Sequence, residues 1–224
     1  MKSQKLVLIF VASLAAAGCT PDWATDNATP FIMEIASITG TSVSSSSGQG
    51  GEIRSDVLTS GSVFNDDAVV AVNVLRKNNN PDLGTSPLEH VYLDRYEVVY
   101  FRTDGRNTEG VDVPYRITGP LGNLRFHTAG PGGQGEIEQT VNITIVRHTA
   151  KLEPPLSNLR GIFIAGSAGN PTDPFVVPGQ GIIYTVAEIT IHGHTIQGDG
   201  LEAKGRVQVA FADFADPAGG GGDE

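Results

Sequence analysis

The stretch from Tyr184 to Phe211, YTVAEITIHGHTIQGDGLEAKGRVQVAF, decides the fold class. Successive side chains of a β-strand point to opposite faces, so a strand with one buried face alternates apolar and polar residues. The first half of the stretch alternates in this way. One predicted face carries Ala187, Ile189 and Ile191, and the opposite face carries Glu188, Thr190, His192 and His194. The pattern predicts a strand that is buried on one side only.

A polar turn follows this strand. Residues 197–200 read QGDG, and Asp-Gly is a favoured dipeptide for a tight β-hairpin. On the returning strand, apolar or small residues occupy one face, namely Gly205, Val207, Val209 and Phe211. Arg206 and Gln208 occupy the other face. The stretch therefore predicts a hairpin at the outside of a two-layer β structure.

The rest of the chain continues the same pattern. Short segments rich in Val, Ile, Tyr, Phe and Thr alternate with segments rich in Gly, Pro, Asn and Ser. Besides the hairpin strands at 182–195 and 202–214, we expect strands near 31–39, 52–58, 66–76, 91–103, 111–117, 122–127, 136–149, 161–165 and 175–177. Many short strands predict an all-β fold, and we expect an antiparallel two-layer sandwich, with a β-barrel as the alternative.

The segment ITIHGHTIQGDGLEAKGRVQVAF, residues 189–211, resembles the terminal hairpin of bacterial immunoglobulin-like modules. This resemblance covers the hairpin only, and it implies an immunoglobulin-like or fibronectin-III-like sandwich. The sequence departs from antibody domains in two respects. It has a single Cys, so it has no cysteine pair, and its one Trp lies outside the predicted core.

The beginning of the chain has the features of a secretory signal. Lys2 and Lys5 precede the apolar run 6–17, which is too short to span a bilayer as a helix. Small residues at 16–18 lead directly to the only cysteine, Cys19. This arrangement resembles the bacterial lipobox, which implies cleavage after residue 18 and a covalent lipid on Cys19. The alternative is an ordinary cleaved signal followed by a chance cysteine.

These features predict the domain organisation. We expect a signal peptide over 1–18, a lipidated tether over 19–30, a β-sandwich domain over 31–216 and a disordered tail over 217–224. The residue after Cys19 is Thr20 where Asp usually marks retention at the inner membrane, so the resemblance implies the outer membrane of a bacterial envelope. The lipid anchor is the expected membrane contact.

The net negative charge of the chain argues against a nucleic-acid partner. The 224 residues carry 15 Lys and Arg against 25 Asp and Glu, which gives a formal net charge of −10. Nucleic-acid binding needs a basic surface that displaces counterions from phosphates, so we expect no nucleic-acid partner. We expect a protein partner in the envelope instead.

Two patterns raise the question of a metal site. His192 and His194 project from one strand face, which suits a metal ion if a third ligand lies nearby. Loop carboxylates such as Asp66, Asp67, Asp104 and Asp112 are the ligands that calcium prefers. We favour the simpler interpretations, which are solvated histidines on a wet strand face and Asp side chains that stabilise turns. No cofactor other than the lipid is expected.

A tyrosine stripe raises the question of a ligand surface. Tyr92, Tyr96 and Tyr100 are expected on one face of a strand. If that face were exposed, it would stack against sugar rings or hold a protein partner. We expect it to be buried, because antiparallel strands use aromatic side chains in the core.

No nucleophile and base can be paired from the sequence, so we expect a protein that is not an enzyme. The expected function is that of a membrane-anchored lipoprotein that serves as a structural or protein-interaction module of the cell envelope. The alternative is a surface module that binds calcium or carbohydrate.

Overall fold

The computed structural model describes residues 29–41, 45–47, 51–77, 90–127, 139–161, 163–164 and 181–214. The chain divides after Pro30 into two compact units. The predicted signal peptide, Cys19, the tether as far as residue 28, the strand near 175–177 and the tail over 217–224 lie outside the described residues. Among the residues that are described, no helix has the length and apolar character that crossing a membrane requires.

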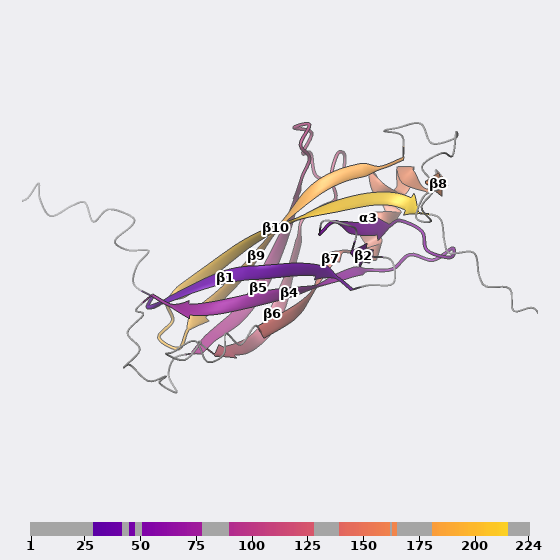
Figure 1. The fold of residues 1–224 in the computed structure, drawn as a ribbon. Helices are drawn as coiled ribbons and strands as arrows, with labels where there is room; N and C mark the ends of the chain where they lie inside the picture. Colours follow the sequence, from indigo (N-terminus) through magenta and orange to yellow (C-terminus); the bar gives the residue numbers. More distant parts are fainter. Residues whose placement is uncertain are drawn as a thin grey trace, which may run out of the picture. The chain divides into compact units, whose positions relative to one another are not determined.

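The second unit, Phe31–Glu224, is mostly β-structure arranged in two sheets (Figure 1). The smaller sheet has three strands in the order β1-β4-β7: β1 (Phe31–Gly40), β4 (Asp66–Arg76) and β7 (Gln139–Val146). Both of its strand pairs are antiparallel.

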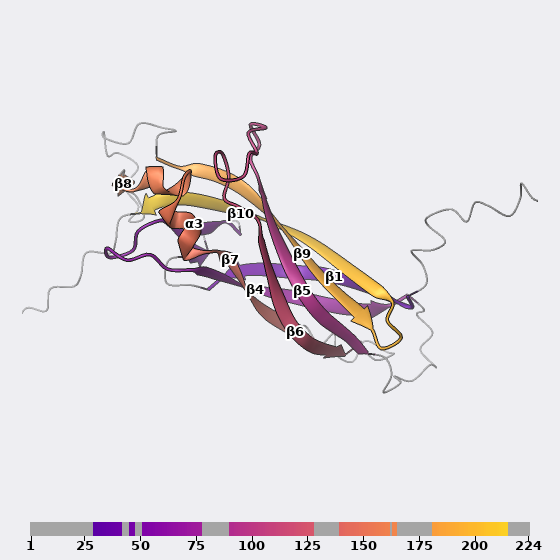
Figure 2. The ribbon, with the colours of Figure 1, turned by 180° about the vertical axis from the view of Figure 1, so that it is seen from behind.

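The larger sheet has seven strands, of which six follow the order β2-β3-β10-β9-β5-β6. The bounds of these six are β2 (Ser45–Ser47), β3 (Ile53–Asp56), β10 (Gly200–Phe214), β9 (Ile183–Thr195), β5 (His90–Phe101) and β6 (Ile117–His127). The seventh strand, β8 (Phe163–Ile164), pairs with the end of β10. Figure 2 shows this sheet from the side on which β5, β6 and β9 face the viewer.

The predicted hairpin is confirmed, with the returning strand β10 beginning two residues earlier than expected. β9 and β10 pair antiparallel, with Ile191 opposite Ala203 and Ile189 opposite Gly205. The face with Ala187, Ile189 and Ile191 is fully buried. Glu188, Thr190, His192 and His194 lie on the opposite face, so the alternation identified the core side correctly.

The expected antiparallel pairing holds for most strand pairs but not for all of them. β3 and β8 both run parallel to β10, with Ile53 opposite Val209 and Phe163 opposite Asp213. A parallel pair needs a long connection between its strands, and it joins segments that lie far apart in the chain. No local sequence pattern records such a pairing.

The apolar core lies between the two sheets. The small sheet contributes the inward residues of its central strand, including Val70 and Val72, and the large sheet contributes Val98, Ile189 and Val209 among others. β1 contacts β10, and β6 contacts β7, so the large sheet curls around the small one on both sides. This curl leaves one face of the large sheet exposed to solvent.

A short helical segment follows β7. It consists of α3 (His148–Leu152) and the single 3-10 turn η1 (Leu156–Leu159), which lie near the C-terminal end of β10 in both views (Figures 1 and 2). Leu156 is completely buried, and Leu159 is nearly so. The segment adds two apolar side chains and one buried lysine, Lys151, to this end of the core.

Candidate functional site

A β-bulge in β5 determines which side chains reach the exposed face of the large sheet. The pairing of β5 with β9 shifts register between Leu93 and Arg95, so Asp94 is an extra residue relative to β9. The pairing with β6 is irregular at the same point, but there β6 has the longer segment, residues 121–123 opposite Asp94. One extra residue inverts the alternation of side chains along a strand. As a result, Tyr92 lies on the outer face, whereas Tyr96 and Tyr100 point into the core.

The predicted tyrosine face is therefore split. Tyr96 and Tyr100 are buried, as expected for a core stripe, but Tyr92 does not share their face. The Tyr100 hydroxyl donates a hydrogen bond to the Ile145 carbonyl. The Tyr96 hydroxyl accepts one from the Thr144 backbone N–H at 3.3 Å. Both tyrosines connect the large sheet to β7, so neither is available to a ligand.

Tyr92 takes part in a different group on the outer face. Its ring stacks on the ring of His194, with centroids 5.5 Å apart. The Nδ1 atom of His194 lies 2.8 Å from Asp94 Oδ1. The bulge thus brings Asp94 beside His194, because it adds one outward residue next to Tyr92.

The two candidate metal-binding histidines have separate partners. The Nδ1 atom of His192 lies 3.6 Å from Glu202 Oε2 of β10, whereas His194 contacts Asp94 of β5. They project from one face of β9, as the spacing predicted, but they engage carboxylates on opposite sides of that strand.

The four candidate calcium ligands are also separated. Asp66 is completely buried and contacts Lys151, while Asp67 accepts a hydrogen bond from the Thr144 hydroxyl. Asp104 forms ion pairs with Arg102 and Arg106, and these cations hold its pKa well below the usual value. Asp112 accepts a hydrogen bond from the Thr108 backbone. Over the described part of the chain, no three His, Cys, Asp or Glu side chains converge as a metal site would require.

The other end of the outer face carries apolar side chains. Phe101 of β5 lies opposite Val186 of β9, and Tyr184 projects from the same face two residues earlier. Tyr184 is 51% exposed and Phe101 is 39% exposed. Together with the half-buried Val99, these residues form what we call the outer apolar patch: Val99, Phe101, Tyr184 and Val186.

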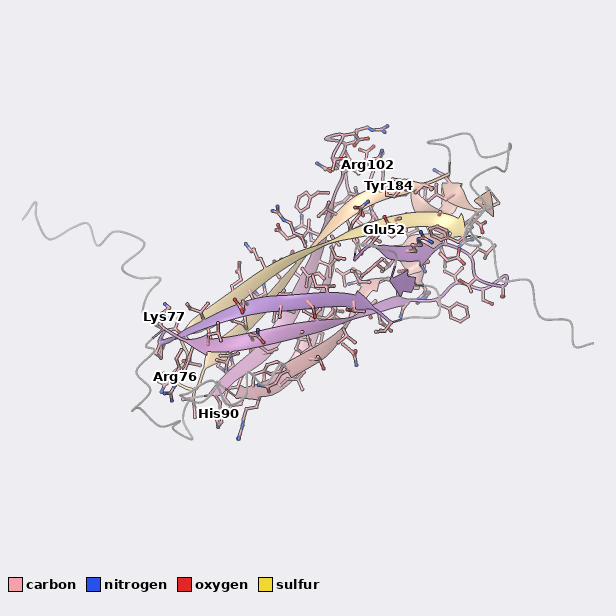
Figure 3. The ribbon with its side chains drawn as sticks, in the orientation of Figure 1. Glu52, Arg76, Lys77, His90, Arg102 and Tyr184 are labelled. Carbon is pink, nitrogen blue, oxygen red and sulfur yellow. The ribbon has the colours of Figure 1, made fainter. Side chains whose placement is uncertain are left out.

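Polar residues border the outer apolar patch. Glu188 of β9 lies opposite Val99 of β5. It forms an ion pair with Arg206 of β10, with 2.6 Å between Nη2 and Oε2. Figure 3 shows Tyr184 and Arg102 toward the same end of the unit, whereas His90, Arg76 and Lys77 lie at the other end. An exposed aromatic surface with a polar border is typical of protein contact sites.

Sequence reasoning missed this patch, although a signal was present. The alternation in Tyr184–His194 places even-numbered residues outside. These residues are polar from Glu188 onward, but Tyr184 and Val186 are apolar. Tyr184 and Val186 are apolar residues at positions where the alternation predicts an outward side chain, and such residues indicate an exposed apolar patch.

A second cluster lies inside the protein, and we call it the buried polar cluster: Ser55, Asp56, Asp66 and Lys151. Lys151 Nζ lies 2.9 Å from Asp66 Oδ1 and donates a hydrogen bond of 2.7 Å to the Asp56 carbonyl. The Ser55 hydroxyl donates to Asp66 Oδ2.

Burial shifts the pKa values of two groups in this cluster. The side chains of Lys151 and Asp66 are both completely buried. Desolvation lowers the pKa of the Lys151 amine, although its contact with Asp66 opposes the shift. Desolvation likewise raises the pKa of Asp56, despite hydrogen bonds from Thr59, Leu58 and Phe214. Both shifts favour the uncharged forms.

Comparison with known proteins adds no family to this description, because no protein-family model and no curated protein matches the chain.

Proposed function

We propose that this protein is a non-enzymatic, lipid-anchored interaction module of the bacterial cell envelope. The observation that carries the proposal is the outer apolar patch, which presents Tyr184 and Phe101 on a rigid sheet. Large aromatic side chains contribute strongly to protein binding, because they bury much area at a small cost in side-chain entropy. The lipobox-like segment ending at Cys19 supports the anchor.

The fold we propose is an immunoglobulin-like sandwich. Its support is the apolar core between the two sheets and the terminal hairpin β9–β10 at the solvent side. The parallel strands β3 and β8 are additions to such a sandwich. The contacts of β1 with β10 and of β6 with β7 are the features that favour the barrel alternative.

Site-specific photocrosslinking in intact cells tests the patch. A photoreactive side chain at position 184 should give a discrete adduct with an envelope protein. The matched control is Ile32 of β1, which is 47% exposed on the other sheet. The same adduct from position 32, or none from position 184, would contradict the proposal.

The anchor has its own test. Replacing Cys19 with Ser should move the protein from the membrane fraction to the soluble fraction, because the acyl chains supply the membrane affinity. A Cys19→Ser protein that stays in the membrane fraction would contradict lipid anchoring. Protease treatment of intact cells would then show on which side of the outer membrane the protein lies, with a periplasmic protein as the control.

Binding of calcium or carbohydrate is the less supported function. The candidate carboxylates are separated, and two of the three tyrosines are buried. A ligand that binds the native state raises the melting temperature. We therefore expect equal melting temperatures in excess chelator and in excess calcium. A higher melting temperature in calcium than in chelator would support the calcium-binding alternative.

A further inference from the structure

The contact between Lys151 and Asp66 places an amine beside a carboxyl group, and both side chains are completely buried. Lys151 Nζ and Asp66 Oδ1 lie 2.9 Å apart. We propose that, after the chain folds, Lys151 and Asp66 condense into an intramolecular isopeptide bond. This inference goes beyond the proposed function, and it depends neither on the outer apolar patch nor on the lipid.

The first argument is the cost of keeping both groups charged. Removing an ammonium and a carboxylate from water is expensive, and their mutual attraction often fails to compensate. Transfer of one proton from Lys151 to Asp66 removes both charges. Burial also lowers the pKa of the Lys151 amine, which favours the neutral form of this nucleophile.

The second argument is placement. The Asp56 carbonyl accepts a hydrogen bond from Lys151 Nζ at 2.7 Å, which holds the amine beside the carboxyl group. Holding two reactants together in this way gives effective concentrations of about 10⁵–10⁸ M in well-oriented cases. The Ser55 hydroxyl donates to Asp66 Oδ2, where it would stabilise the negative charge that develops during attack.

The reaction balances without an added reagent. After the proton transfer, the Nζ lone pair attacks Cγ of the neutral Asp66 carboxyl group and forms a C–N bond. The Cγ–Oδ1 bond then breaks, and Oδ1 leaves as water with its own proton and one proton from Nζ. Oδ2 stays as the amide carbonyl oxygen, still hydrogen-bonded to Ser55. No atom changes its oxidation state.

The bond would fasten α3 to the first residue of β4. Asp66 and Lys151 are 85 residues apart in the sequence, so the link closes a large loop in the unfolded chain. α3 has five residues, and a helix of this length has little stability of its own. A covalent link at Lys151 would keep this segment against the core.

Peptide mapping of the folded full-length protein tests the proposal. Trypsin cuts after Lys and Arg, so an unlinked chain yields 55–76, 148–151 and 152–160 as linear peptides. The isopeptide bond blocks cleavage at Lys151. It should give one branched peptide, 55–76 joined to 148–160, lighter than the two separate chains by one water. Fragmentation should place the branch on Asp66. Recovery of only the linear peptides would overturn the proposal and leave a buried ion pair.

Two controls make the result specific. Glu202 and Lys204 also make contact, at 2.8 Å, but both are exposed, so their peptides should remain linear in the same digest. Lys151→Arg should abolish the branched peptide, because a guanidinium does not condense in this way. The branched peptide decides the question, since Asp-Gly sequences such as Asp104-Gly105 also lose water when they form succinimides.

Discussion

The single extra residue at Asp94 changes which side chains of β5 face outward. It moves Tyr92 to the outer face, and it leaves Tyr96 and Tyr100 in the core. A period of two cannot reveal such an insertion, because each half of the strand alternates normally. The bulge becomes visible only in the pairing with β9, which involves residues far away in the sequence.

The bulge predicts unequal effects for two tyrosine substitutions. Tyr96→Ala removes a buried ring and should destabilise the protein by about 3–5 kcal/mol, as large-to-small changes in a core do. Tyr92→Ala removes a partly exposed ring, so it should cost about 1 kcal/mol from lost stacking. Urea denaturation of both variants measures the difference. Equal costs would show that the two rings share one environment.

Gly193 predicts a steric effect at one residue. A Cβ atom there would lie 2.6 Å from the Tyr92 carbonyl oxygen, which belongs to the backbone and cannot rotate away. We expect Gly193→Ala to destabilise the protein by roughly 1–3 kcal/mol.

Gly200→Ala is the matched control, because a Cβ atom at Gly200 meets nothing within 4 Å. Its unfolding free energy should stay within about 0.5 kcal/mol of the unmodified protein. A loss of stability at Gly200 as large as that at Gly193 would contradict the steric explanation.

At the scale of elements, β10 organises the large sheet. It pairs with β3, β8 and β9, and its inward face contacts β1. Gly205 permits that contact, since a Cβ atom there would lie 2.9 Å from Ile35 Cγ2 and 3.1 Å from Ile38 Cδ1.

A double-mutant cycle tests this close approach of β1 to β10. Gly205→Ala should destabilise the protein by about 1–3 kcal/mol through overpacking. In an Ile35→Ala background the same change should cost less, because Cγ2 is no longer present. Stability measured by denaturant for the four proteins gives the coupling energy. A coupling of zero would show that the contact does not limit the size of residue 205.

The elements also show how far the sequence could predict the fold. The expected strands at 31–39, 66–76, 91–103 and 182–195 each match an observed strand to within a few residues. They were predictable because each is rich in Val, Ile and other residues that favour strands, a property that local sequence records. By contrast, the expected strand at 111–117 is a loop up to residue 116. β2 lies in a Ser-rich segment for which we expected no strand.

Sequence reasoning recovered less of the candidate sites. The shared outer face of His192 and His194 followed from alternation, but their partners Glu202 and Asp94 did not, because these depend on pairing between strands. Lys151 gave no signal at all. It lies in a short polar segment, HTAKL, and only the tertiary packing of α3 shows that it is buried.

At the scale of the whole unit, the two sheets share one core, but their strands differ in protection. β10, β9 and β5 have neighbours on both sides, whereas β2 and β6 are the ends of the sheet path. Backbone amides in central strands open only with the global unfolding of a domain, and edges open more readily.

Hydrogen exchange measures that difference directly. We expect the slowest amides in the mutually paired parts of β9 and β10, such as Ile189, Ile191 and Val209. The amides of β6, such as Leu124, should exchange faster. Uniform exchange rates over these strands would contradict a single core with defined edges.

The position of β10 in the chain has a consequence for the order of events during biosynthesis. Its partners β3, β8 and β9 all precede it in the sequence, so none can complete its pairing before residues 200–214 have emerged. Folds dominated by such long-range contacts form slowly, because the chain must close large loops first. A polypeptide of this topology therefore cannot complete its larger sheet until β10 has been synthesised.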